Sequence, residues 1–127
     1  HYSMIQKILG NAEQIDAKNI QHEYRELFTS KETVHNAYKL IRDLFIFTNF
    51  RLILIDKQGI TGKKVEYQSI PYQNIIRYSI ETAGSLDLDA ELKIWLSGQN
   101  TPIQKRFSRK LNIFEIQQTL STHIFEK

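Results

Sequence analysis

Alternating hydrophobic and polar positions between residues 34 and 107 predict a series of β-strands. The clearest alternation runs from Leu86 to Leu96, where every second residue is apolar and most of the others are charged. A period of two over this length is typical of a strand with one buried face. Two continuous apolar runs in IRDLFIFTNFRLILID (residues 41–56) flank a short turn and predict a central hairpin buried on both faces. The strand positions expected in the core are Leu44, Ile46, Leu52, Leu54, Leu92 and Ile94.

Helical spacing appears before the first strand. Residues 3–10 have the pattern of a short helix that begins with a capping box and ends at a glycine. A second helix is expected from Asp16, which is a good N-cap residue. Ile15 and Ile20 flank this start at the spacing of a hydrophobic staple. Tyr24 and Leu27 continue the apolar stripe, and the helical signal fades after residue 28.

The end of the chain predicts one more helix, over residues 111–125. Asn112 is placed as its N-cap and Glu115 as the third helical residue of a capping box. Ile116 and Leu120 lie on its apolar stripe, so we expect them to pack on the strands. Pro71 is expected at a strand end, because proline has no N–H to donate to a ladder.

Three segments of the chain resemble the bacterial pleckstrin-homology-like family: residues 41–56, 62–75 and 81–98. The resemblance runs from about Tyr38 to Gly98 and more loosely to the C-terminus. It implies a mainly β (α+β) fold, a pleckstrin-homology-like barrel of two antiparallel sheets with a C-terminal capping helix and short N-terminal helices. Residues 1–127 would form a single domain, with a helical extension over 1–29, the barrel over 33–108 and the capping helix over 111–125.

Composition limits the classes of function. The 127 residues are enough for one domain with a real core, and a net charge of +3 permits contact with an anionic surface without requiring it. Cysteine is absent, which excludes disulfides and thiol catalysis and fits a reducing, cytoplasmic setting. We expect neither a signal peptide nor a transmembrane segment. No run of like charges suggests nucleic-acid binding.

The residues carry no recognisable catalytic pattern. Neither a nucleophile elbow nor a glycine-rich phosphate loop is present. The four histidines, at positions 1, 22, 35 and 123, are scattered and none is paired at helical spacing. We therefore expect no enzyme activity, no metal and no cofactor.

An acidic row on the strand that ends at Leu96 is the most conspicuous set of polar residues. Asp87, Asp89 and Glu91 alternate along the strand, so they share a face with their Cα atoms about 7 Å apart. They are either the solvated side of the strand or a set of oxygens able to bind a cation or take part in acid–base chemistry. Together with Trp95 they are candidates for a specific protein interface, because acids on an exposed strand discourage random pairing.

Basic residues offer a candidate anion or lipid site. Eukaryotic pleckstrin-homology domains bind phosphoinositide head groups with basic residues near the first hairpin, and Lys39 and Arg42 lie close to the corresponding turn. Arg51 opens the next predicted strand, whereas Lys63 and Lys64 occupy a turn that is most simply solvated. The set suits an unidentified small polar or anionic ligand.

The family resemblance implies a function without catalysis. Its members are associated with ring-shaped homo-oligomers built by strand pairing between subunits, with ligand sites at the junctions and a role in stress response. The expected partner is therefore a second copy of the chain. The alternative is a peripheral binder of anionic lipid or phosphorylated head groups, although membrane contact is not favoured.

Overall fold

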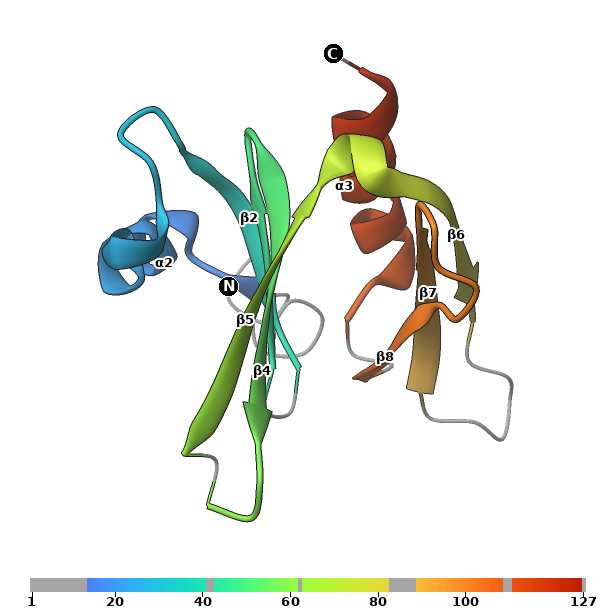
Figure 1. Cartoon of the computed structure of the whole chain (residues 1–127), viewed down its shortest axis with the longest axis horizontal. Helices are drawn as coiled ribbons and strands as arrows, with labels where there is room; N and C mark the ends of the chain where they lie inside the picture. The colour runs from blue at the N-terminus through green and yellow to red at the C-terminus, as the bar shows by residue number, and fades with distance from the viewer. Residues whose placement is uncertain (1–13, 41–42, 62, 83–88, 109–110, 127) are drawn as a thin grey trace, which may run out of the picture. The chain divides into compact units, whose positions relative to one another are not determined.

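The computed structural model describes residues 14–40, 43–61, 63–82, 89–108 and 111–126 (Figure 1). The first predicted helix, Arg42 and Asp87 lie outside these residues. The described chain forms two compact units, residues 14–72 and residues 73–126. In chain order the elements are β1 (Gln14–Ile15), α2 (Ala17–Glu23), η2 (Arg25–Leu27), β2 (Val34–Lys39), β3 (Leu44–Thr48), β4 (Arg51–Gln58), β5 (Lys64–Pro71), η3 (Tyr72–Asn74), β6 (Ile75–Glu81), β7 (Asp89–Leu96), β8 (Ile103–Ser108) and α3 (Ile113–Phe125).

The first unit is an antiparallel sheet of five strands in the order β1-β2-β3-β4-β5. Its central hairpin, β3–β4, is fully apolar at Leu44–Phe47 and Leu52–Ile55, and all eight of these residues are buried. The register pairs Ile46 with Ile53 and Leu44 with Ile55. The sequence prediction of a central hairpin buried on both faces is confirmed.

Helix α2 lies against one face of this sheet, as Figure 1 shows. The side chain of Asp16 caps it by accepting a hydrogen bond from the Lys18 amide at 2.9 Å, as predicted. Ile20 is buried against Ile46 and Ile53, and Ile15 packs on the same cluster, which agrees with the predicted staple. The helix ends at Glu23, earlier than its apolar stripe suggested, and a 3-10 turn follows.

The two-residue strand β1 is an element that the sequence did not predict. It pairs with β2 through Gln14–Tyr38 and Ile15–Ala37. Two residues are too few to show a period, so only the partner strand defines this element. Pro71 ends β5, as expected of a residue without an N–H.

The second unit contains an antiparallel sheet in the order β6-β7-β8 and the helix α3. The inward residues Ala90, Leu92 and Ile94 of β7 are buried, which confirms the predicted alternation. The side chain of Asn112 caps α3 by accepting a hydrogen bond from the Phe114 amide at 3.0 Å. The buried residues of the helix are Ile113, Ile116 and Leu120.

One irregularity of this sheet escaped the sequence analysis. The pairing of β6 with β7 shifts between Ile75 and Arg77, so Ile76 is an extra residue in the ladder and is 64% exposed. An isoleucine inside an alternating run is expected to be buried, but a bulge changes the direction of the strand.

The fold class is therefore mainly β, with two antiparallel sheets, a C-terminal helix and a short N-terminal helix. Every position assigned to the core from the sequence is buried. The prediction of two antiparallel sheets with a C-terminal helix is confirmed: the described strands form two sheets, and none of them pairs into both.

Replacing Leu92 with Ala tests the placement of this core. Leu92 is 1% exposed, so the substitution removes buried methyl groups and leaves a cavity. We expect a loss of about 2–5 kcal/mol in the free energy of unfolding, measured by denaturant titration. Ser79→Ala on the exposed side of β6 is the control and should change stability by less than about 0.5 kcal/mol. A similarly small change for Leu92→Ala would show that this face of β7 is not buried.

Candidate functional site

A buried carboxylate forms the most highly connected polar group among the described residues. Glu32 is 3% exposed, and its carboxylate accepts hydrogen bonds from Arg51, Thr48 and the amide of Thr29. Arg51 binds it through two nitrogens, with Nε and Nη2 each 2.8 Å from a different carboxylate oxygen. The hydroxyl of Thr48 donates to the same group at 2.7 Å. We call Glu32, Thr48 and Arg51 the Glu32 hub.

The hub connects segments that are distant in the sequence. Nη2 of Arg51 also donates to the carbonyl of Leu27 at 2.6 Å, and Nη1 donates to Ser69 Oγ at 2.8 Å. The carbonyl of Thr48 accepts from the Tyr72 hydroxyl at 2.6 Å. One guanidinium therefore joins η2, the loop that carries Glu32, and the strands β4 and β5.

Two side-chain amides complete the attachment of the loop before β2. Gln21 on α2 donates to the carbonyl of Glu32 at 2.9 Å and accepts from the Val34 amide at 2.6 Å. Asn49, in the β3–β4 turn, accepts from the Thr33 amide at 2.8 Å and donates to the carbonyl of Lys31 at 3.1 Å. The loop is thus held by α2 on one side and by the hairpin turn on the other.

The contacts of Glu32 and Arg51 determine the pKa values of these two groups. Burial alone would raise the pKa of Glu32, but the hydrogen bonds from Arg51, Thr48 and the Thr29 amide outweigh it and hold the pKa below its usual range. The same pair raises the pKa of Arg51. A lowered pKa makes a carboxylate a weaker base, and the donors that surround Glu32 give the hub a structural role.

Arg51 is a predicted anion-binding residue, and the structure places its guanidinium in the hub, where it binds Glu32. Nothing in the sequence pointed to Glu32, because its loop has no apolar period and lies 19 residues before Arg51. In the sequence, an arginine that opens a strand after a short turn is compatible with either role.

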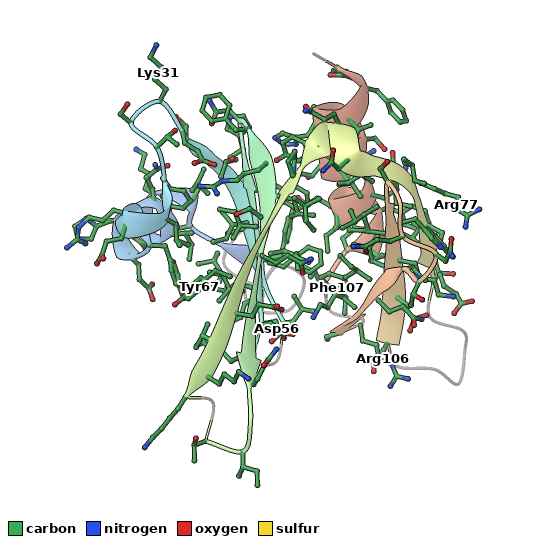
Figure 2. All side chains as sticks on the ribbon, viewed as in Figure 1. Lys31, Asp56, Tyr67, Arg77, Arg106 and Phe107 are labelled. Atoms are coloured by element: carbon green, nitrogen blue, oxygen red, sulfur yellow. The ribbon has the colours of Figure 1, made fainter. Side chains whose placement is uncertain are left out.

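The other basic candidates lie at one end of the five-stranded sheet but not on one face. Lys39 is in register with Leu44, Ile55 and Tyr67, and all three lysines, Lys39, Lys63 and Lys64, are exposed. Lys64 is three residues from Tyr67, so it projects from the face opposite to that of Lys39. Figure 2 shows how Tyr67 and Asp56 point to opposite sides of the β4–β5 pair at this end. The lysines therefore remain candidates without a shared pocket.

The interface candidates lie on the exposed side of β7, which we call the outer sheet face, with the neighbouring Arg77 and Arg106. Asp89 is exposed, whereas Glu91 and Trp95 are half-buried. The register sets Glu91 opposite Arg106 of β8, and Gln104 Nε2 lies 3.4 Å from its carboxylate. On the other side Glu91 is in register with Glu81 of β6, so charges of both signs are mixed on this face, as is typical of a solvated surface.

Trp95 is covered by a residue of the neighbouring strand. The guanidinium carbon of Arg77 lies 4.1 Å from the centroid of the indole ring, a cation–π contact. Figure 2 shows Arg77 projecting from β6 on the side away from α3. Among the residues that the structure describes, no three histidine or acidic side chains gather as a metal site.

The geometry and the sequence together identify the class. Residues 3–124 match the family described as bacterial PH domain, so the chain belongs to this family. It is 51% identical to the uncharacterized protein YjqA of Bacillus subtilis (strain 168) over 118 residues, which cover 92% of this chain and 94% of YjqA.

Two solved structures of similar sequence share the fold. A pleckstrin-homology domain from Shewanella amazonensis SB2B is 45% identical, with a TM-score of 0.83, covering 96% of this chain and 98% of that domain. A DUF1696 family protein with a pleckstrin-homology domain from Shewanella loihica PV-4 is 43% identical, with a TM-score of 0.80, covering 89% and 97%. The family and the fold that the sequence suggested are confirmed. None of the described helices is long and apolar enough to cross a bilayer.

Removing Arg51 tests the hub. Arg51→Met leaves the carboxylate of Glu32 buried without its cation, so we expect a loss of about 3 kcal/mol in unfolding free energy. Arg51→Lys should lose less unfolding free energy than Arg51→Met but should stay below the unmodified protein, because an ammonium group cannot make the bidentate contact. Arg77→Met is the matched control on an exposed arginine, with an expected loss below about 1 kcal/mol in the same denaturant titration. Equal losses at the two positions would contradict the account.

The lowered pKa of Glu32 also predicts a pH dependence. Because the folded-state pKa lies below the unfolded value of about 4.3, the hub's contribution is complete above that pH and is lost as the pH falls through the folded-state pKa. Unfolding free energies of the unmodified protein and Glu32→Gln should therefore differ most near neutral pH and converge in acid. A difference that stays constant down to strongly acidic pH would contradict the ionised, donor-bound state.

Proposed function

We propose that this chain is a non-catalytic assembly module whose copies join by strand pairing into a closed cyclic homo-oligomer in the bacterial cytoplasm. The observation that carries the proposal is the set of free sheet edges. The strands β5 and β6 each end a sheet without a partner strand among the described residues. Such an edge presents unpaired backbone donors and acceptors that a strand from a neighbour can satisfy.

These two edges suit a ring. A head-to-tail contact needs two different edges on each subunit, and it closes when the rotation between subunits permits. The eight-residue β5 is the longer edge, and β6 pairs regularly after the bulge at Ile76. We therefore assign the junction to β5 of one subunit and to residues 77–81 of β6 in the next. Exposed Glu66 on β5 and exposed Arg77 on β6 give the two edges opposite charges at one position each.

The outer sheet face would supply side chains to this junction, since β6 carries Arg77 of that face. Trp95 is a large aromatic beside mixed charges, and aromatic residues are enriched at protein interfaces. Asp89 and Glu91 lie along the same face and would contact a small polar ligand held between subunits. The ligand site and a role in stress response rest on the family resemblance.

A second candidate function is peripheral binding of anionic lipid or phosphorylated head groups. It is favoured by the exposed Lys39, Lys63 and Lys64 at one end of the five-stranded sheet, and by a fully exposed Ile60 in the adjoining β4–β5 turn. Lysines around an apolar tip suit a negatively charged membrane surface. This function ranks second because Arg51 is held in the hub and the lysines occupy both faces.

Light scattering on the purified chain tests the ring, and a pair of prolines tests its edge. We expect a single species of several subunits at tens of micromolar. Consecutive strand residues direct their N–H groups to opposite sides, so one of Tyr67→Pro and Gln68→Pro disrupts the β4–β5 ladder and the other removes an outward donor. The variant that keeps the folded monomer should lose the multi-subunit species, and its neighbour serves as the control that unfolds.

A folded outward-proline variant that keeps the full mass would exclude β5 as the junction. A monomeric unmodified protein would exclude the ring. If that monomer also sedimented with anionic vesicles and not with neutral ones, the second candidate function would replace the first.

A further inference from the structure

Two like charges lie next to each other at the edge of the three-stranded sheet. Glu81 of β6 is in register with Glu91 of β7, so both side chains share one face of the sheet. Like charges directly opposite each other on two strands are destabilising. Glu91 has Arg106 of β8 in register on its other side, whereas Glu81 faces the edge of the sheet. A strand that completes this edge is therefore favoured if it sets a cation against Glu81.

A complementary charge opens β5, the strand on the other side of the proposed junction. Lys64 is the first residue of β5 and is exposed, as is Glu81. Neither Lys64 nor Glu81 forms a salt bridge with another residue that the structure describes. Both charges are thus available to a strand of a neighbouring subunit.

One antiparallel register gives every position of this junction a partner of matching character. Its pairs are Lys64–Glu81, Val65–Ile80, Glu66–Ser79, Tyr67–Tyr78 and Gln68–Arg77. The apolar and aromatic members share one face of the combined sheet, and the polar members share the other. The carboxylate of Glu66 is also one diagonal step from Arg77, which is within reach of a long side chain.

The alternative registers are less favourable. A shift by one or three positions joins the apolar face of one strand to the polar face of the other, because side chains alternate. An antiparallel shift by two positions sets Glu66 against Glu81. The parallel pairings that keep the faces together set either Lys64 against Arg77 or the buried Ile70 against Glu81.

We infer that β5 of one subunit and β6 of the next pair antiparallel in this register, with Lys64 facing the partner's Glu81. The inference rests on the proposed ring and specifies its junction. Backbone hydrogen bonds hold an added strand at any register, whereas side-chain pairs select one of them. Each subunit gives its lysine to one junction and its glutamate to the next, so the pair also favours head-to-tail order.

Two introduced cysteines report the register directly, because the chain has none of its own. Directly opposed residues have Cα atoms about 4.5–5.5 Å apart, which a disulfide can span. On oxidation, Glu66→Cys combined with Ser79→Cys should give covalent chains of several subunits on a non-reducing denaturing gel. Glu66→Cys combined with Glu81→Cys is the control for a register shifted by two positions and should cross-link far less.

Exchange of charge tests the Lys64–Glu81 pair without a disulfide. Lys64→Glu and Glu81→Lys each replace an attraction between subunits by a repulsion. Each should raise the subunit concentration at half dissociation on the order of fivefold at low salt, and combined in one chain they should restore the unmodified value. Lys31→Glu makes the same change of charge beside the β3–β4 turn, at the other end of the sheet, and should shift this concentration by less than about twofold. Circular dichroism and melting temperature confirm that each variant is folded.

The outcomes separate this inference from the proposed ring. A multi-subunit protein that cross-links only in the shifted control, or in neither variant, would overturn the register and leave the ring intact. Single charge variants that dissociate like the unmodified protein would do the same. A disulfide that forms only within one chain would show that the two strands meet inside a subunit and would overturn the inference. A monomeric unmodified protein would overturn both the register and the ring.

Discussion

The first unit depends on a charge that has no contact with water. The carboxylate of Glu32 is buried in a loop without regular structure, and burying a carboxylate without partners is strongly unfavourable. Arg51 and Thr48 compensate this cost with charge-assisted hydrogen bonds. Because Arg51 also binds the carbonyl of Leu27 and the hydroxyl of Ser69, the compensation is possible only when η2, the hairpin and β5 are all in place.

This requirement explains how a short helix stays on the sheet. Only Ile20 of α2 is fully buried, and a seven-residue helix is marginal by itself. The hub and Gln21 attach the segments that follow the helix, so the apolar contacts of Ile15, Tyr24 and Leu27 form around a fixed connection. Hydrogen bonds from side chains also satisfy the backbone of a loop that has no ladder of its own.

The sequence predicted features that depend on local pattern. The alternation in β7, the apolar hairpin, the N-caps Asp16 and Asn112, and Pro71 at the end of β5 follow from residues a few positions apart. The strand β1, the bulge at Ile76 and the 3-10 turn after α2 depend on neighbours that are distant in the sequence, so no local signal announced them.

The candidate site was also predictable only where local pattern decides the structure. Alternation correctly placed Glu91 and Trp95 on the less buried side of β7. It could not reveal that Arg77 stacks on Trp95, because that contact depends on the register between two strands. Arg51 resembled an anion ligand for the same reason: its partner Glu32 is close in space only after the hairpin and the loop have met.

Charges of both signs lie on the outer sheet face, where Arg106 is in register with Glu91. The strands β5 and β6 end their sheets without a partner strand among the described residues. Under the proposed function, these two edges are where this bacterial pleckstrin-homology domain would contact a second copy.

Native-state hydrogen exchange, read residue by residue, tests the central role of the hub most directly. The amides to follow are those of Tyr24, Thr29 and Val34, which donate to Ile20, Glu32 and Gln21 respectively. If the hub ties α2 and its loop to the sheet, these amides open together with the strands β3 and β4, at nearly the same free energy. Exchange of all three at a free energy near zero, while β3 and β4 remain protected, would show that the segment is not held by Glu32 and Arg51.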